Sequence, residues 1–255
     1  MMDLKPSTPI LQYSITPWVV VLMLLGLLGG CDGLPGKPTP EDRWQAAAEV
    51  TDFSQLYSMN CAGCHGVNGR FGAARPLNDP IYLALVTDGA LRAAIAQGVP
   101  GTTAPAFALQ AGGSLTDKQI DVLVDGIRNR WGTAEKFKNV TLPPYSLQDA
   151  VAAGSGPGDP RRGAAAYETY CAQCHGKDGT GGSKGRSVID PVYLALTSNQ
   201  ALRTAVIVGR IDLGMPDWRA DISGRPMSAQ EISDVVAWLA AHRPPSQLSQ
   251  AAAHK

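Results

Sequence analysis

The sequence carries no net charge, because 22 lysine and arginine residues are balanced by 22 aspartate and glutamate residues. This balance excludes the strongly basic surface that nucleic-acid-binding proteins use, so we expect no nucleic-acid partner. Aromatic residues make up only 6% of the chain, whereas glycine (28 residues) and proline (19 residues) are frequent. Hydrophobic residues still reach 44%, which is enough for folded cores and argues against wholesale disorder.

The apolar run near the N-terminus, from Trp18 to Gly30, has only thirteen residues. A membrane-spanning helix needs roughly 20, so the run is predicted to be the core of an export signal. It ends in Gly29-Gly30-Cys31 and resembles a bacterial lipoprotein signal. The resemblance implies cleavage before Cys31, a lipid on its sulfur, and an exported protein of the periplasm or cell surface that the lipid anchors to a membrane. Two alternatives are ordinary cleavage, which leaves Cys31 a free thiol, and an uncleaved anchor that reaches back to Ile10.

An internal repeat organises the rest of the chain. The two copies are offset by 110 to 112 residues throughout. Three pairs of segments carry the similarity: Met59–Gly66 with Thr169–Gly176, Asp79–Leu85 with Asp190–Leu196, and Ala90–Arg92 with Ala201–Arg203. The sequence therefore predicts a duplicated domain.

Each copy is predicted to be helical. Asp79 and Asp190 are good N-caps, and each precedes a proline at the first helical position. Gly98 and Gly209 stand where these helical stretches are expected to end. The last helix of each copy begins with a capping box, Thr116 with Gln119 and Ser228 with Glu231. Apolar residues at helical spacing follow each box and predict one buried stripe per helix: Ile120, Leu123, Val124 and Ile127, and Ile232, Val235, Val236 and Leu239.

No alternating strand pattern is present, so the expected fold class is all-α. Glycine and proline are concentrated between the two copies, which predicts a linker that runs over the surface. The expected organisation is a signal peptide (1–30), a flexible tether (31–46), domain 1 (47–135), a linker (136–159), domain 2 (160–245) and a disordered tail (246–255).

Each copy contains one Cys-x-x-Cys-His motif: Cys61, Cys64 and His65 in the first, and Cys171, Cys174 and His175 in the second. Two thiols three residues apart on a helical turn are able to reach the two vinyl groups of one haem. The following histidine is then aimed at the haem iron from the same side. The motifs therefore predict two covalently bound haem c groups, with thioether bonds at the cysteines and iron ligation by His65 and His175.

A lone Cys-x-x-Cys is also compatible with a redox dithiol or a zinc site. A thioredoxin-like dithiol needs a βαβ context, which is absent, and a four-cysteine zinc site leaves both histidines unexplained. The cysteine count favours haem, because the five cysteines divide into one for lipid and four for thioether bonds.

With these motifs, each copy resembles a class I cytochrome c domain. The resemblance covers residues 47–135 and 160–245 and implies a small helical bundle that encloses the haem. It also implies a distal loop that supplies a sixth iron ligand, usually methionine. Met215, forty residues after His175, matches that position. The alternative for Met215 is a core filler, but ligation by His175 and Met215 would give a stable six-coordinate iron suited to electron transfer.

The first copy departs from this pattern, because Ala104 aligns with Met215 and cannot bind iron. Three explanations remain open for the first haem. Its iron has an open or water-bound distal position, takes an unusual ligand such as Lys, Tyr or Asn, or is reached by a residue of the other domain. We favour the open position.

Two finer predictions concern packing around the haem. Phe53 in the first copy aligns with Gly163 in the second, and Gly126 aligns with Trp238, so each copy has one large residue and one glycine at these two positions. Because close packing conserves volume, we expect Phe53 over Gly126 and Trp238 over Gly163 at the helix crossings. The resemblance further implies that the carbonyl of Pro76 accepts a hydrogen bond from His65, with Ser187-Val188 at the equivalent place in copy two.

The leading functional hypothesis is a membrane-tethered dihaem cytochrome that carries electrons between redox protein partners, and not an enzyme. One alternative is a haem enzyme or a gas- or peroxide-binding protein that uses an open site at haem 1. Another is a fixed subunit of a larger respiratory or photosynthetic complex.

Overall fold

The computed structural model describes residues 39, 44–100, 102–219 and 224–245. The predicted signal peptide, Cys31 and the predicted tail over 246–255 lie outside the described residues. The chain divides into two units, 1–45 and 46–255, and both copies of the repeat lie in the second unit.

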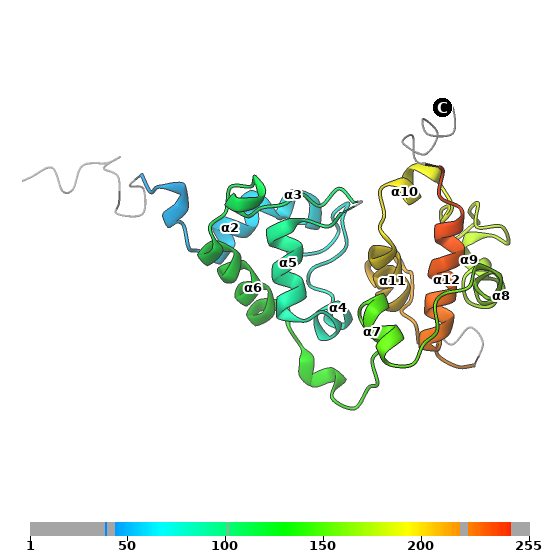
Figure 1. The fold of residues 1–255 in the computed structure, drawn as a ribbon. Coiled ribbons are helices and arrows are strands. Elements are labelled where there is room, and N and C mark those ends of the chain that lie inside the picture. The colour runs from blue at the N-terminus through cyan, green and yellow to red at the C-terminus, as the bar shows by residue number, and fades with distance from the viewer. Residues whose placement is uncertain (1–38, 40–43, 101, 220–223, 246–255) are drawn as a thin grey trace, which may run out of the picture. The chain divides into compact units, whose positions relative to one another are not determined.

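The described residues contain helices and no strand, apart from isolated bridges, so the all-α prediction is confirmed (Figure 1). Five α-helices occur in the same order in each copy. In the first they are α2 (Phe53–Asn60), α3 (Ala62–His65), α4 (Pro80–Leu85), α5 (Asp88–Gln97) and α6 (Asp117–Trp131). In the second they are α8 (Pro160–Tyr170), α9 (Ala172–His175), α10 (Pro191–Ala195), α11 (Asn199–Val208) and α12 (Ala229–Ala241). Short 3₁₀ turns complete the set: η2 (Ala47–Glu49), η3 (Leu109–Ala111), η4 (Ala134–Phe137) and η5 (Ile211–Leu213). Of the helices in this part of the chain, none is long and apolar enough to span a membrane.

The predicted helix starts are confirmed, but one helical stretch per copy is in fact two helices. The Asp79 carboxylate accepts hydrogen bonds from the amides of Ile81 and Tyr82 at 2.8 and 2.9 Å. Asp190 caps α10 through one bond, which it accepts from the Tyr193 amide at 2.8 Å. Each stretch then breaks before Gly98 and Gly209 because a new N-cap, Thr87 or Ser198, starts a second helix. A hydroxyl that caps a new helix competes with continuation of the old one.

The last helix of each copy forms as predicted. Thr116 and Gln119 make a capping box at the start of α6, and Ser228 and Glu231 make one at the start of α12. The predicted apolar stripes are buried, with Ile120, Leu123 and Ile232 at or near 0% exposure. At roughly 25 cal/mol per Å² of buried apolar area, these stripes are a main source of stability for both copies.

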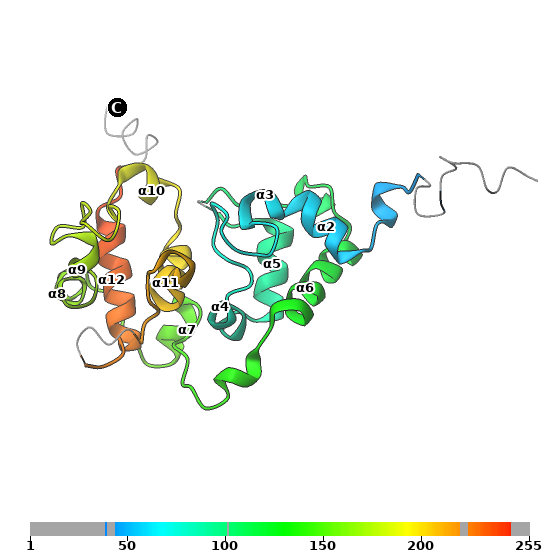
Figure 2. The ribbon, with the colours of Figure 1, turned by 180° about the vertical axis from the view of Figure 1, so that it is seen from behind.

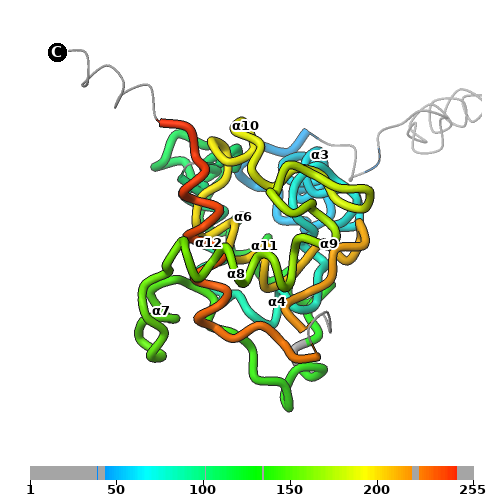
Figure 3. Tube along the Cα trace, turned by 90° about the vertical axis from the view of Figure 1, so that its right-hand side faces the viewer, coloured from blue at the N-terminus to red at the C-terminus, as the bar shows by residue number. Residues whose placement is uncertain are grey.

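Glycine brings the first and last helices of each copy into close contact. A Cβ built on Gly126 of α6 would overlap the Phe53 ring of α2, which confirms that pair. In copy two, α8 packs against α12 (Figure 3). A Cβ added to Gly163 of α8 would lie 2.7 Å from the Cβ of Trp238 and overlap the Asp234 carbonyl. The contact is confirmed there, but the indole ring of Trp238 stacks on Tyr167 at 4.2 Å instead of covering Gly163.

The segment between the copies is more ordered than a linker that merely runs over the surface. It contains α7 (Leu147–Ala152), which packs against α12 (Figure 2). Arg203 of α11 is 0% exposed and donates to the Pro144 carbonyl from Nε and Nη2, at 3.1 and 2.9 Å. Gln200 donates to the Tyr145 carbonyl at 2.9 Å. The linker backbone is therefore part of the polar interior of copy two.

Candidate haem sites

The first cysteine motif lies on a single helical turn. α2 ends at Asn60, Cys61 is the N-cap of α3, and His65 is the last residue of α3. The His65 amide donates to the Cys61 carbonyl at 2.9 Å, which places both cysteines and the histidine on one turn. Gly66 ends the turn at φ +81°, a left-handed conformation that favours glycine.

The second motif has the same local structure. The His175 amide donates to the Cys171 carbonyl at 3.0 Å, and Gly176 ends α9 at φ +80°. The two predicted sets of site residues, Cys61, Cys64 and His65 and Cys171, Cys174 and His175, are thus each brought together, within their own copy.

Each motif histidine is held by a backbone carbonyl. Nδ1 of His65 lies 2.7 Å from the Arg75 carbonyl, and Nδ1 of His175 lies 2.7 Å from the Arg186 carbonyl. The prediction of Pro76 as acceptor was therefore wrong by one residue, and so was the placement in copy two at Ser187-Val188. The register of a loop decides which carbonyl faces the ring, and the loop sequence does not specify that register. Engagement of Nδ1 leaves Nε2 of both rings available to a metal.

A tyrosine in each copy fastens the end of the motif, and the sequence reasoning missed both. The hydroxyl of Tyr57 donates to the Gly66 carbonyl at 2.8 Å, and that of Tyr167 donates to the Gly176 carbonyl at 2.7 Å. Burial raises the pKa of each tyrosine to about 12, so both hydroxyls stay protonated and keep donating. Their equal distance from the motif, four residues before the first cysteine, was the available signal.

No disulfide bond joins any of the four motif cysteines. Burial, with a smaller contribution from the neighbouring cysteine, raises the pKa of Cys61 to about 11 and that of Cys171 to about 12. A catalytic redox dithiol instead requires a lowered thiol pKa, so this electrostatic setting disfavours the thioredoxin-like alternative. Within the described ranges no three His, Cys, Asp or Glu side chains gather around a common point for a metal ion. Burial also lowers the pKa of His65, which favours the neutral imidazole that binds metals.

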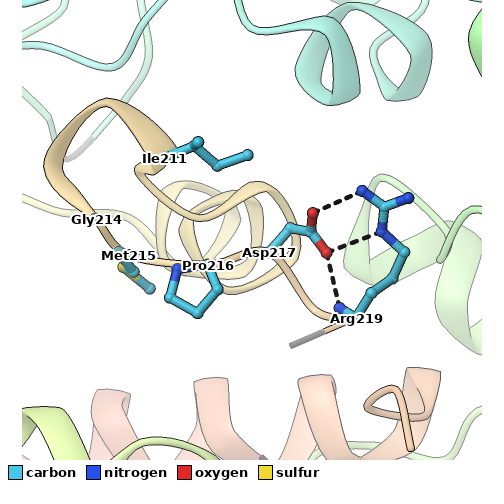
Figure 4. Close-up of a pocket in the computed structure, with 6 residues that line it drawn as sticks. All are labelled: Ile211, Gly214, Met215, Pro216, Asp217 and Arg219. Carbon is cyan, nitrogen blue, oxygen red and sulfur yellow. Dashed lines mark hydrogen bonds and ion pairs between the residues drawn. The ribbon is translucent and has the colours of Figure 1, made fainter. Parts of the chain in front are cut away.

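Met215 lines a cavity of about 620 Å³ in the second copy (Figure 4). The loop that carries it begins with η5 and turns at Gly214, where φ is +83°. Met215 and Arg210 exchange two backbone hydrogen bonds, both of 3.0 Å, which fix the position of the methionine. Asp217 and Arg219 form an ion pair of 2.7 Å at the edge of the same cavity. The residues that line this cavity do not include Cys171, Cys174 or His175, so iron ligation by Met215 stays a prediction.

Comparison with known proteins supplies the family. A profile described as "Cytochrome C oxidase, cbb3-type, subunit III" matches the chain twice, at residues 48–125 and 158–239. The chain belongs to this family. Its two domains are tandem cytochrome c domains. Domains of this family bind haem c covalently and function in electron transfer.

Two further comparisons add little. No curated protein matches this chain. A solved chain of the Kuenenia stuttgartiensis reducing HAO-like protein complex is similar over 82% of this chain and 99% of its own length, at 18% identity and a TM-score of 0.41. That similarity is too low to support a functional conclusion.

The first cytochrome c domain also contains a buried group that fits a haem. Nη1 of Arg75 is buried without a hydrogen-bond partner, and the guanidinium carbon lies 5.2 Å from the centre of the Tyr82 ring. A buried guanidinium nitrogen without a hydrogen-bond partner is costly, and a further anion beside it would lower that cost. The carboxylates of a haem are such anions, and the Arg75 carbonyl already contacts His65. Together with the thiols and the two anchored imidazoles, Arg75 shows that the residues present fit the haem.

The distal loop of the first domain places Ala104 where the second domain has Met215. Gly98 and Gly209 end α5 and α11 at φ +70° and +71°. A Cβ added to Gly98 would lie 2.7 Å from the Ala104 carbonyl, and one added to Gly209 would lie 2.6 Å from the Met215 carbonyl. The alignment of the two positions is therefore structural as well as sequential.

Proposed function

We propose that this protein is a membrane-tethered dihaem cytochrome c that passes electrons between two redox protein partners. The observation that carries the proposal is the duplicated motif geometry. Each domain presents two thiols and an imidazole on one helical turn, with a backbone carbonyl 2.7 Å from the imidazole Nδ1. Cys61, Cys64 and His65 would hold one haem, and Cys171, Cys174, His175 and Met215 would hold the other.

Met215 supports electron transfer at the second haem. A thioether opposite a histidine stabilises the reduced iron and gives a relatively high potential. If His175 and Met215 both held the iron, a bound haem would change oxidation state with little rearrangement, which suits a carrier. The bound haems supply the electron chemistry, and the protein supplies their ligands and orientation.

Anchoring through a lipid on Cys31 is the second part of the proposal. It rests on the short apolar run, which is below the roughly 20 residues of a spanning helix, and on the Gly29-Gly30-Cys31 ending. A tether over residues 31–46 would let the domains reach partners while the protein stays at the membrane surface. Export to the periplasm or cell surface follows from the same signal.

Mass spectrometry of the protein purified from membranes of an exporting bacterium tests both parts. We expect a mass that exceeds the mature polypeptide by two haems and an acyl-bearing modification. C61S/C64S should lose one haem and C171S/C174S the other, while each single-domain variant keeps its remaining haem. C31A should release a haem-loaded protein from the membrane. A colourless protein with no added haem mass would refute the proposal.

The family description favours a second candidate, a fixed subunit of a larger respiratory complex. The same haem chemistry serves a mobile carrier and a fixed subunit. The size of the protein after gentle detergent extraction separates them. A lone lipoprotein elutes at the mass of a single chain, whereas a fixed subunit elutes within a complex of several chains.

A further inference from the structure

The distal loops of the two domains share one backbone contact. The Val99 amide donates to the Ala104 carbonyl at 3.1 Å, as the Arg210 amide donates to the Met215 carbonyl at 3.0 Å in domain 2. The other contact differs, because the Ala104 amide donates to the Thr102 hydroxyl and the Met215 amide donates to the Arg210 carbonyl. At the shared position, domain 1 has a methyl group where domain 2 has a thioether.

No neighbouring residue of the loop replaces the missing ligand. The sequence from Gly98 to Leu115 contains no methionine, histidine, cysteine, lysine or tyrosine. Met59 lies two residues before Cys61, at the end of α2, and is 70% exposed. It therefore belongs to the motif side of the haem and does not supply the distal position.

The loop is also held in place. The Phe107 amide donates to the Ile95 carbonyl at 3.1 Å, and the Leu115 amide donates to the Phe107 carbonyl at 2.8 Å. Gly113 packs so closely on the Phe107 backbone that an added Cβ would overlap it. These contacts tie the loop to α5 and to its own far end, so a large shift that delivers a ligand from elsewhere in it is disfavoured.

The chemistry of the loop selects the kind of ligand. The 24 residues from Ala93 to Thr116 contain no charged side chain or histidine. The Thr102 hydroxyl is occupied, because it donates to the Val99 carbonyl at 2.7 Å and accepts from the Ala104 amide at 3.2 Å. Peroxide cleavage requires an acid–base group beside the iron, and none is provided here. A loop without charged side chains favours small uncharged ligands.

We propose that the loop around Ala104, over residues 102–115, covers a binding site for a small uncharged diatomic ligand, such as CO or NO, at the first haem. The site is open because Ala104 stands where domain 2 has Met215. This inference rests on the proposed function, since it requires a haem in domain 1. It divides the roles of the two domains: domain 2 is closed and carries electrons, whereas domain 1 binds ligand.

The absorption spectrum of the reduced full-length holoprotein, with and without CO, tests the site. We expect CO to shift the Soret band of about half of the haem, because only one of the two repeated domains has an open site. A104M should abolish the shift, and the matched variant M215A should extend it to both haems. Ala104 is exposed, so the substitution should not prevent folding.

The outcomes distinguish this inference from the proposed function. A protein that carries two haems by mass but does not respond to CO overturns the open site and leaves the dihaem cytochrome standing. A CO response that persists unchanged in A104M also overturns it, because the alanine would not be what opens the site. A protein without haem in domain 1 overturns the proposed function itself.

Discussion

Gly163→Ala is the substitution that tests the helix crossing of the second domain most directly. The added Cβ would overlap the Asp234 carbonyl and lie 2.7 Å from both the Asp234 carbonyl carbon and the Cβ of Trp238. Two of these atoms belong to the backbone of α12 and cannot rotate away. The two helices must therefore separate or tilt for the methyl group to fit.

The size of the effect follows from two opposing contributions. Overpacking of a close helix contact costs about 1–3 kcal/mol, and more where backbone blocks relief. Alanine recovers about 1 kcal/mol over glycine through its helix propensity. We expect a net loss of about 2 kcal/mol in the free energy of unfolding of domain 2, which corresponds to roughly 30-fold faster exchange of its protected amides.

Hydrogen exchange followed by mass spectrometry resolves the two domains in the intact holoprotein. G163A should accelerate exchange in peptides from α8 and α12 and leave α2 and α6 unchanged. The matched variant G126A should affect α2 and α6 instead, and less strongly, because the obstacle there is the Phe53 ring, a half-buried side chain that is able to rotate. Unchanged protection of α8 and α12 in G163A would refute the crossing geometry.

Two further predictions concern the linker and acid stability. R203M removes the donors to Pro144 and Ser233, so we expect a loss of about 2–4 kcal/mol in the free energy of unfolding and faster proteolysis near residues 138–147. R92M, at the equivalent position of domain 1, breaks only exposed ion pairs and should cost under about 1 kcal/mol. Equal effects of the two substitutions on thermal unfolding would contradict a buried role for Arg203. The Arg225 guanidinium lowers the pKa of Glu231 from 4.5 to about 2. Because the pKa of Glu231 is lower in the folded state than in the unfolded state, its ion pair stabilises the fold above about pH 4.5, and this stabilisation is lost as the pH falls toward 2. The difference in thermal midpoint between wild type and E231Q should therefore shrink over that range. The capping box of domain 1 has the uncharged Gln119 at the equivalent position, so it provides a control without an ion pair. A midpoint difference between wild type and E231Q that stays constant with pH would contradict the ion pair.

Much of the fold was predictable because its signals are local. A capping box or an aspartate before proline satisfies free amides within one turn, so Asp79, Thr116 and Ser228 mark helix starts wherever they occur. The break before α5 and α11 was missed because Thr87 and Ser198 act as N-caps only when the preceding turn already ends. The exchange of Phe53 and Gly126 was predictable because close packing conserves volume, whereas the turn of the Trp238 ring toward Tyr167 depends on the rotamer.

By itself, the sequence determined that the protein is helical, duplicated and built around two Cys-x-x-Cys-His motifs, because those features depend on spacing along one short segment. Only the tertiary structure decided that the carbonyls of Arg75 and Arg186, and not that of Pro76, hold the two histidines. It also decided that Arg203 binds the linker while its repeat partner Arg92 pairs with Asp117 and Asp121 at the surface. Loop register and burial depend on contacts between distant residues, so identical residues in two copies of one repeat acquire different roles.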